Sequence, residues 1–125
     1  MNTPIRILVA LPGAVMLLNA FGWLFRPAAT AESLGMPYLD GLARSTQVGD
    51  LGAFFATAGV TILLGVWKKE RTWLYCGAML LGGAAVIRTL SWAAHGADLA
   101  TTFIGSEIVM VAIVLFGASK TSREG

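Results

Sequence analysis

Four long apolar runs constrain the fold of this 125-residue chain more than any other feature of its sequence. A helix needs about 20 mainly apolar residues to cross a bilayer. The runs that meet this length are residues 5–25, 47–67, 73–94 and 99–118. With 56% hydrophobic and 13% charged residues, the composition lies outside the usual range of soluble domains. We predict an all-α fold: an integral membrane four-helix bundle that forms a single domain over residues 1–125.

The basic residues predict how the bundle is oriented, because cytoplasmic segments retain Lys and Arg. Arg6, the turn at 68–71 and the tail from Lys120 lie on one side of the membrane, whereas the other side carries only Arg26 and Arg44. Both termini are therefore predicted to be cytoplasmic, with residues 26–46 as an outer loop. The same bias explains the basic character of the chain, so no nucleic-acid partner is expected.

The first apolar run has an alternative interpretation as a secretory signal. Ala29-Thr30-Ala31 resembles the small-residue site at which such signals are cleaved. The stretch before it is longer than the signal core of about 7–15 residues. We favour a retained first helix, and cleavage stays open.

Three ionisable residues, Asp50, Arg88 and Glu107, interrupt the apolar runs. Each would cost about 2.5–3.5 kcal/mol at the centre of a span, so we expect all three to face the interior. Arg88 either extends toward the outer boundary or, as we favour, forms a salt bridge with Asp50 or Glu107, since its fork of donors can serve two carboxylates. Glu107 would be neutral without a partner and ionised with one, and the protonation of both acids stays open.

The polar residues of the spans gather at a similar depth. Counting along each helix puts them in the outer half of the bilayer, while the inner half is almost wholly apolar. Ligand sites in bundles lie between facing helices, so we predict a polar-lined pocket that opens outward or toward the outer leaflet. The candidate ligand-binding residues are Asn19, Asp50, Arg88, Ser91, His95, Thr102 and Glu107.

Two of these candidates also have simpler structural interpretations. Asn19 would satisfy its amide by a hydrogen bond between helices, and His95 would be a residue of the loop or of the interface.

The second run shows a stripe at helical spacing, predicted to face the interior. It comprises Gln47, Asp50, Phe54, Thr57 and Thr61. Small residues also recur at every fourth position from Gly49 to Gly65, a pattern that permits close helix contact.

The connection before this run is long for a compact bundle. Residues 27–34 look like a short helix, with Pro27 in its first turn and Gly35 just past its end. The segment is either a lid over the pocket or an amphipathic connector.

One family resemblance covers nearly the whole chain. The residues that carry it are Gly22-Trp23-Leu24-Phe25-Arg26-Pro27, Ala31 to Leu34-Gly35, Arg44, Gly49, Gly52, Arg88 and Glu107. They resemble a family of unknown function within the DoxX-like group of small bacterial membrane proteins. The resemblance implies a four-helix protein of the bacterial inner (cytoplasmic) membrane. Some DoxX relatives are subunits of thiosulfate-oxidising quinone reductases, a role that depends on a partner subunit. A more distant similarity is to sterol-isomerase-like bundles, in which carboxylates line a pocket for an apolar ligand.

No defined catalytic motif accompanies this pattern. The sequence has no phosphate-binding glycine loop, HExxH motif or nucleophile elbow. Cys76 has no metal-ligand companion and is expected to be a small, buried apolar residue. We therefore predict no metal site and no classical soluble enzyme mechanism. Catalytic residues and cofactor remain unknown, and whether the protein is an enzyme stays open.

Three functions fit the sequence. The favoured one is a membrane protein that binds a small amphipathic or apolar ligand, a lipid or quinone, in the polar pocket. The second is an accessory or structural membrane subunit whose buried charges form a salt bridge that fixes helix register. The third is a small enzyme or proton-coupled transporter that uses Glu107. Besides the lipid bilayer, a partner membrane protein or a second copy of the chain is left open.

Overall fold

The computed structural model describes residues 1–121 and is all-helical over this part of the chain. Four of its helices are long and apolar enough to cross a membrane, as the sequence predicted. A fifth, short helix lies between the first two of them. The helices are α1 (Thr3–Phe25), α2 (Pro27–Ser33), α3 (Gly41–Lys68), α4 (Arg71–His95) and α5 (Thr101–Ser119).

Local signals define several helix ends. The side chain of Asn2 accepts a hydrogen bond from the Ile5 backbone N–H at 3.1 Å and so caps the start of α1. Lys69, with φ 57°, and Gly96, with φ 71°, end α3 and α4 in the left-handed conformation. These two residues reverse the chain between successive helices.

The α3 helix begins at Gly41 rather than near Gln47. Residues 41–46 are too polar to extend an apolar run, although they continue the helix. Gln47 itself is buried: its Nε2 donates to the Pro37 carbonyl and its Oε1 accepts from the Leu39 N–H, both at 2.9 Å. These bonds fold the α2–α3 connection back against α3, so the expected long outer loop is largely ordered structure.

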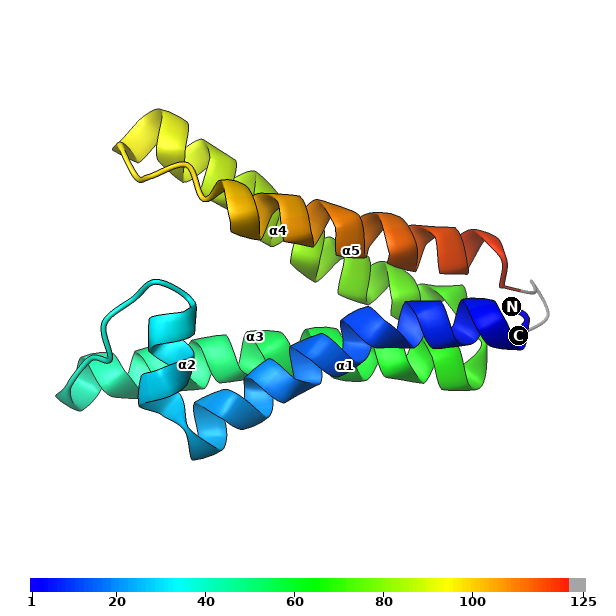
Figure 1. Ribbon diagram of the computed structural model, residues 1–125, viewed down its shortest axis with the longest axis horizontal. Helices are drawn as coiled ribbons and strands as arrows, with labels where there is room; N and C mark the ends of the chain where they lie inside the picture. The colour runs from blue at the N-terminus through cyan, green and yellow to red at the C-terminus, as the bar shows by residue number, and fades with distance from the viewer. Residues whose placement is uncertain (122–125) are drawn as a thin grey trace.

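The helices form two arms that meet at one end and diverge at the other (Figure 1). One arm contains α1, α2 and α3, and the other contains α4 and α5. The two termini lie at the joined end, whereas α2 and the α4–α5 turn lie at the open end.

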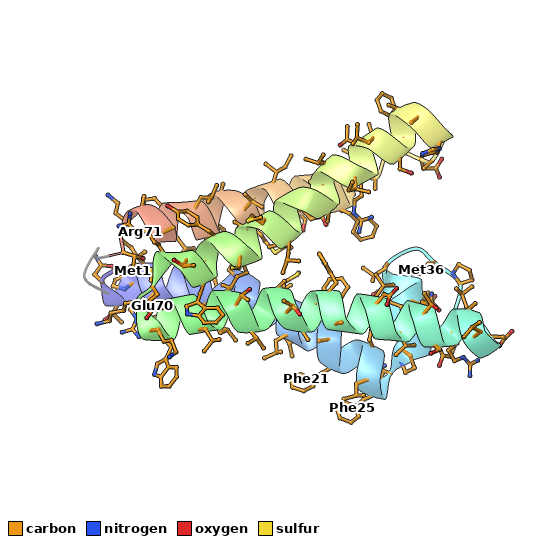
Figure 2. All side chains as sticks on the ribbon, turned by 180° about the vertical axis from the view of Figure 1, so that it is seen from behind. Met1, Phe21, Phe25, Met36, Glu70 and Arg71 are labelled. Atoms are coloured by element: carbon orange, nitrogen blue, oxygen red, sulfur yellow. The ribbon has the colours of Figure 1, made fainter. Side chains whose placement is uncertain are left out.

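Hydrogen bonds to the end of α5 help to close the joined end. The Met1 amino group donates to the Lys120 carbonyl at 2.9 Å, and Arg71 Nη2 donates to the Thr121 carbonyl at 2.8 Å. Figure 2 shows Met1, Glu70 and Arg71 together at this end. At the other end, Phe21 and Phe25 stack on each other and point away from the bundle. Such exposed apolar side chains suit a lipid-facing surface.

Glycines let the helices approach closely in the joined half of the bundle. At the α1–α3, α3–α4 and α1–α5 crossings, a glycine is so close to its neighbour that an added Cβ would clash, as expected where small residues let helices approach. These contacts are Gly59 with Gly13 and Leu17, Gly65 with Leu74, Gly77 with Ile62, and Gly117 with Val9. In contrast, a Cβ on Gly49, Gly83 or Gly105 would meet nothing within 4 Å. The close contacts between the two arms therefore lie in the joined half, whereas the close contact of Gly22 with Thr30 in the open half joins α1 to α2 within one arm.

The predicted interior stripe of α3 is only partly correct. Gln47 and Thr61 are buried, but Asp50 and Thr57 are exposed. At about 100° per residue, Asp50 and Thr57 lie roughly 60–80° around the helix from Gln47. They consequently fall at the edge of the stripe, where the diverging arms leave α3 uncovered.

Candidate functional site

An ion pair joins α4 to α5 in the open half of the bundle. Arg88 Nε lies 3.2 Å from Glu107 Oε1. The side chain of Glu107 is only 9% exposed, whereas that of Arg88 is 37% exposed. Neither of these two atoms has a hydrogen-bond partner in the described part of the chain. Their contact is therefore an ion pair whose angle does not meet the requirements of a hydrogen bond. The contact leaves both groups with unused hydrogen-bonding capacity.

Phe103 contributes to the position of the guanidinium. The carbon at the centre of the Arg88 guanidinium lies 5.0 Å from the centre of the Phe103 ring, within the range of a cation–π interaction. Phe103 precedes Glu107 by four residues, so both side chains project from the same face of α5. One helix thus supplies both contacts to Arg88.

The ion pair lines a small cavity of about 160 Å³ between the two arms. Its polar lining comes from Asn19, Arg88, Ser106 and Glu107. Apolar side chains from both arms complete it: Val15, Met16, Leu34, Phe55, Leu81, Phe103 and Met110. We call it the polar cavity.

A larger cleft of about 610 Å³ adjoins the polar cavity at Arg88. Its walls come from α3, from α4 and from the residues that follow α2. The lining residues are Leu34, Met36, Leu51, Phe54, Phe55, Met79, Leu80, Gly83, Ala84, Ile87 and Arg88. Leu34, Phe55 and Arg88 belong to both linings. We call this space the apolar cleft, since Arg88 is its one charged lining residue among those described.

The seven sequence candidates do not form one cluster. Asn19, Arg88 and Glu107 line the polar cavity, and Asn19 Nδ2 donates to the Val15 carbonyl of its own helix at 3.0 Å. Ser91 is half-buried, and both His95 and Thr102 are exposed. None of these last three residues lines the polar cavity or the apolar cleft.

Asp50 lies elsewhere, which corrects the expected geometry of two acids around Arg88. It is exposed and lines another groove, of about 620 Å³, which shares Met36 and Leu51 with the apolar cleft but is not lined by Arg88. Within residues 1–121, Arg88 forms an ion pair with Glu107 and none with Asp50. Along the axis of α3, Asp50 is about 26 Å from Trp67. This distance is most of the bilayer's apolar thickness of about 30 Å, so Asp50 can reach polar surroundings without a partner.

Sequence reasoning did not anticipate four lining residues that matter for the site. Phe103 and Ser106 were recognisable only from their spacing to Glu107 on α5. Leu34 and Phe55 carried no signal, because their role depends on how α2 and α3 fold toward α4. Apolar residues in a span look alike in sequence, whichever surface they face.

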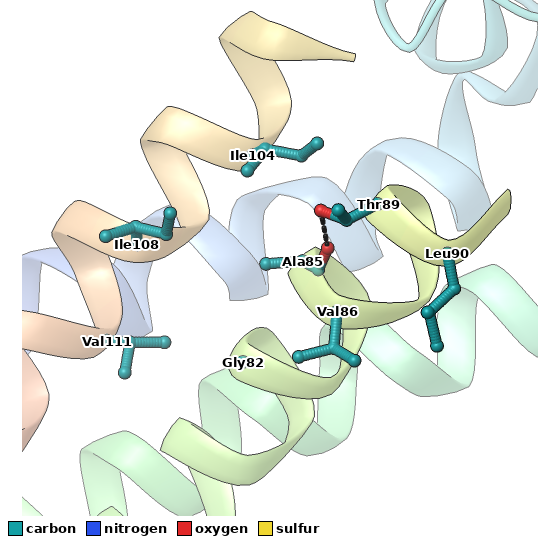
Figure 3. Close-up of a pocket in the computed structure, with 8 residues that line it drawn as sticks. All are labelled: Gly82, Ala85, Val86, Thr89, Leu90, Ile104, Ile108 and Val111. Carbon is teal, nitrogen blue, oxygen red and sulfur yellow. Dashed lines mark hydrogen bonds between the residues drawn. The ribbon is translucent and has the colours of Figure 1, made fainter. Parts of the chain in front are cut away.

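A further groove of about 360 Å³ lies between α4 and α5 (Figure 3). It shares no lining residue with the polar cavity or the apolar cleft. Figure 3 shows the hydrogen bond that Thr89 Oγ1 donates to the Ala85 carbonyl at 2.9 Å. The lining is otherwise apolar: Gly82, Val86, Leu90, Ile104, Ile108 and Val111. Such an apolar groove suits contact with lipid chains.

Residues 1–121 bring together no group of three His, Cys, Asp or Glu side chains that could hold a metal ion. The prediction that Cys76 is buried is wrong, because its side chain is exposed on α4. Comparison of the chain with protein-family models, with curated proteins and with solved structures finds no significant match.

Proposed function

We propose that this protein binds an amphipathic molecule of the bilayer, a lipid or quinone, between its two arms. The polar end of the molecule would enter the polar cavity, and its apolar part would fill the apolar cleft. The observation that carries this proposal is the position of Arg88, which lines both spaces and pairs with the buried Glu107.

The energetics of buried charge support this role. A partly desolvated ion pair inside a membrane protein is costly to maintain, and such residues commonly mark functional paths or sites. If the ion pair served only to fix α4 against α5, side chains that filled the space around it would strengthen the pair. Instead a cavity adjoins it, and Gly83 leaves one wall of the adjacent cleft without a side chain.

The shape of the cleft supports entry from within the membrane. Met79 and Ile87 line the apolar cleft and are themselves largely exposed, at 74% and 65%. Exposed apolar residues on spanning helices face lipid. A molecule of the outer leaflet could therefore pass between α3 and α4 without leaving an apolar environment.

The cellular setting is part of the proposal. The positive-inside pattern supports cytoplasmic termini, so the open end of the bundle would face outward. The DoxX-like resemblance supports the bacterial inner membrane as the location. A protein partner or a second copy of the chain would bind elsewhere on the apolar surface. A role of Glu107 in proton exchange, as in an enzyme or a transporter, would require that the bound molecule be converted or moved.

A salt bridge that only fixes helix register is the second candidate function. It is favoured by one observation: the pair connects α4 to α5 directly. The two functions differ in what substitution of Glu107 does to bound small molecules at equal stability.

Mass spectrometry of small molecules extracted from detergent-purified protein tests the proposal. Wild type is compared with Glu107→Gln, which removes the buried charge. Asp50→Asn is the matched control, because it neutralises an acid of α3 that lies outside both spaces. We expect one molecular species enriched with wild type and Asp50→Asn and lost with Glu107→Gln. Absence of any enriched species, together with a large loss of thermal stability in Glu107→Gln alone, would favour the purely structural role.

A further inference from the structure

We infer that the polar cavity selects a head group without net charge that carries a hydroxyl. The inference deepens the proposed function and rests on it. It follows from the charges and hydrogen-bonding groups that line the cavity and the cleft.

The charges of the site cancel. Among the described residues that line the polar cavity and the apolar cleft, Arg88 is the one cation and Glu107 is the one anion. An ionised pair at 3.2 Å has no net charge. An anionic head group would leave one uncompensated negative charge among apolar side chains, and a cationic head group would leave one positive charge. Both are costly where water is excluded.

The hydrogen-bonding groups of the cavity are mixed. Arg88 has five N–H donors, and the ion pair involves only its Nε. Glu107 offers its second oxygen as an acceptor, and the Asn19 carbonyl oxygen is also free to accept because Nδ2 makes that residue's bond to Val15. Ser106 can donate or accept. A hydroxyl, which both donates and accepts, can bond to Arg88 and to Glu107 at once.

The two volumes separate the head from the chain. A cavity of about 160 Å³ accommodates a small head group but is smaller than the pockets of roughly 300–1,000 Å³ that hold drug-sized ligands. The apolar cleft, at about 610 Å³, lies within that range. The fitting molecule is therefore a long-chain amphiphile with a small hydroxylated head, such as a fatty alcohol or a monoacylglycerol.

A series of probes with one chain and three heads tests this inference. Oleyl alcohol, oleyl phosphate and oleylamine differ in head charge and share the same hydrocarbon chain. Binding to the full-length protein in an uncharged detergent is measured by native mass spectrometry. For wild type we expect oleyl alcohol to bind at least about tenfold more tightly than either charged probe. The cost of placing one uncompensated charge in this site exceeds the free energy that corresponds to a tenfold change in affinity.

Substitutions of the pair should change the preference according to charge. Glu107→Gln gives the site a net positive charge and should favour oleyl phosphate. Arg88→Gln gives it a net negative charge and should favour oleylamine. The exchange variant Arg88→Glu with Glu107→Arg keeps zero net charge and should keep the preference for oleyl alcohol. This exchange variant also provides the test if one of the single variants does not fold.

The outcomes separate the inference from the proposed function. Preference of wild type for oleyl phosphate or oleylamine would overturn the uncharged head group while leaving ligand binding intact. The same conclusion follows if the exchange variant prefers oleyl phosphate. Equal binding of all three probes to wild type and variants, or no binding of any, would overturn the proposed function as well.

Discussion

Gly59 of α3 packs directly against Gly13 of α1. A Cβ on Gly59 would lie 2.9 Å from the Gly13 carbonyl oxygen and 2.8 Å from the Leu17 backbone nitrogen. Both neighbours are backbone atoms of a regular helix, so they cannot move aside as a flexible side chain can. This contact sets the distance between α1 and α3 and thereby the shape of the arm that faces the apolar cleft.

Replacement of Gly59 by Val should destabilise the protein. Overpacking of a close contact costs about 1–3 kcal/mol, and the cost here arises from separation of α1 from α3. Thermal unfolding in detergent measures the effect. Gly49→Ala is the control on the same helix, because its Cβ would meet nothing. It should leave stability unchanged or raise it by roughly 0.5–1 kcal/mol through helix propensity. Equal melting temperatures for wild type and Gly59→Val would contradict the close contact.

Gln47 should hold the connection between α2 and α3 in place. Gln47→Ala removes the partly buried hydrogen bonds to Pro37 and Leu39, at a cost of about 0.5–1.5 kcal/mol for each bond. Hydrogen exchange should rise in residues 36–40 more than elsewhere. The exposed neighbour Thr46, changed to Ala, is the control. Uniform exchange in the two variants would show that the connection is held by other contacts.

The structure separates what sequence could predict from what it could not. Four spans followed from the length of the apolar runs, since the bilayer imposes that length on any helix. Pairing of Arg88 with one of two acids followed from the cost of isolated charge, but the choice of acid did not. It depends on the direction in which α3 faces at Asp50, and that direction is set by the contacts of Gly59, Gly65 and Gly77.

The divergence of the two arms had no sequence signal. Glycines in the spans were expected to permit close packing, and those of the joined half do so. Gly49, Gly83 and Gly105 look the same in sequence but face open space. Whether a glycine admits a neighbour or leaves a gap is decided by where the neighbouring helix runs, and this is a property of the whole bundle.

Arg88 and Glu107 should be energetically coupled. A double-mutant cycle of Arg88→Gln and Glu107→Gln should give a coupling free energy of about 1–3 kcal/mol, because each single change leaves the other group without its partner. Equilibrium unfolding in mixed micelles provides the four stabilities. The Asp40–Arg44 pair, at 3.1 Å on the surface, is the matched control and should couple weakly, since solvent screens it. If the effects of the Arg88 and Glu107 substitutions on stability were additive, the two side chains would have no significant interaction free energy.

Orientation in the membrane can be checked with single cysteines. In a Cys76→Ala background, Asp98→Cys should react with a membrane-impermeant maleimide in intact cells, because the α4–α5 turn is expected outside. Lys69→Cys should react only after the membrane is permeabilised, since the basic turn is expected on the cytoplasmic side. The Cys76→Ala protein itself is the unlabelled control. The reverse pattern would invert the predicted topology.

Gly83 gives the most direct test of the apolar cleft. Its missing side chain leaves space in the wall formed by α4, and a Cβ there would meet nothing within 4 Å. Gly83→Leu should fill part of the cleft and improve helix propensity, so the protein should lose the co-purifying amphiphile without loss of thermal stability. Mass spectrometry of the extract and a melting curve on the same sample measure both quantities.

Gly105→Leu provides the comparison that makes the result specific to the cleft. Gly105 lies on α5, is equally open to an added side chain, and does not line the cleft. The Gly105 variant should therefore retain the amphiphile at the wild-type ratio. Loss in both variants would mean that added apolar volume disturbs binding wherever it is placed. Retention in both would show that the chain of the ligand lies outside the apolar cleft, even if Arg88 and Glu107 hold its head.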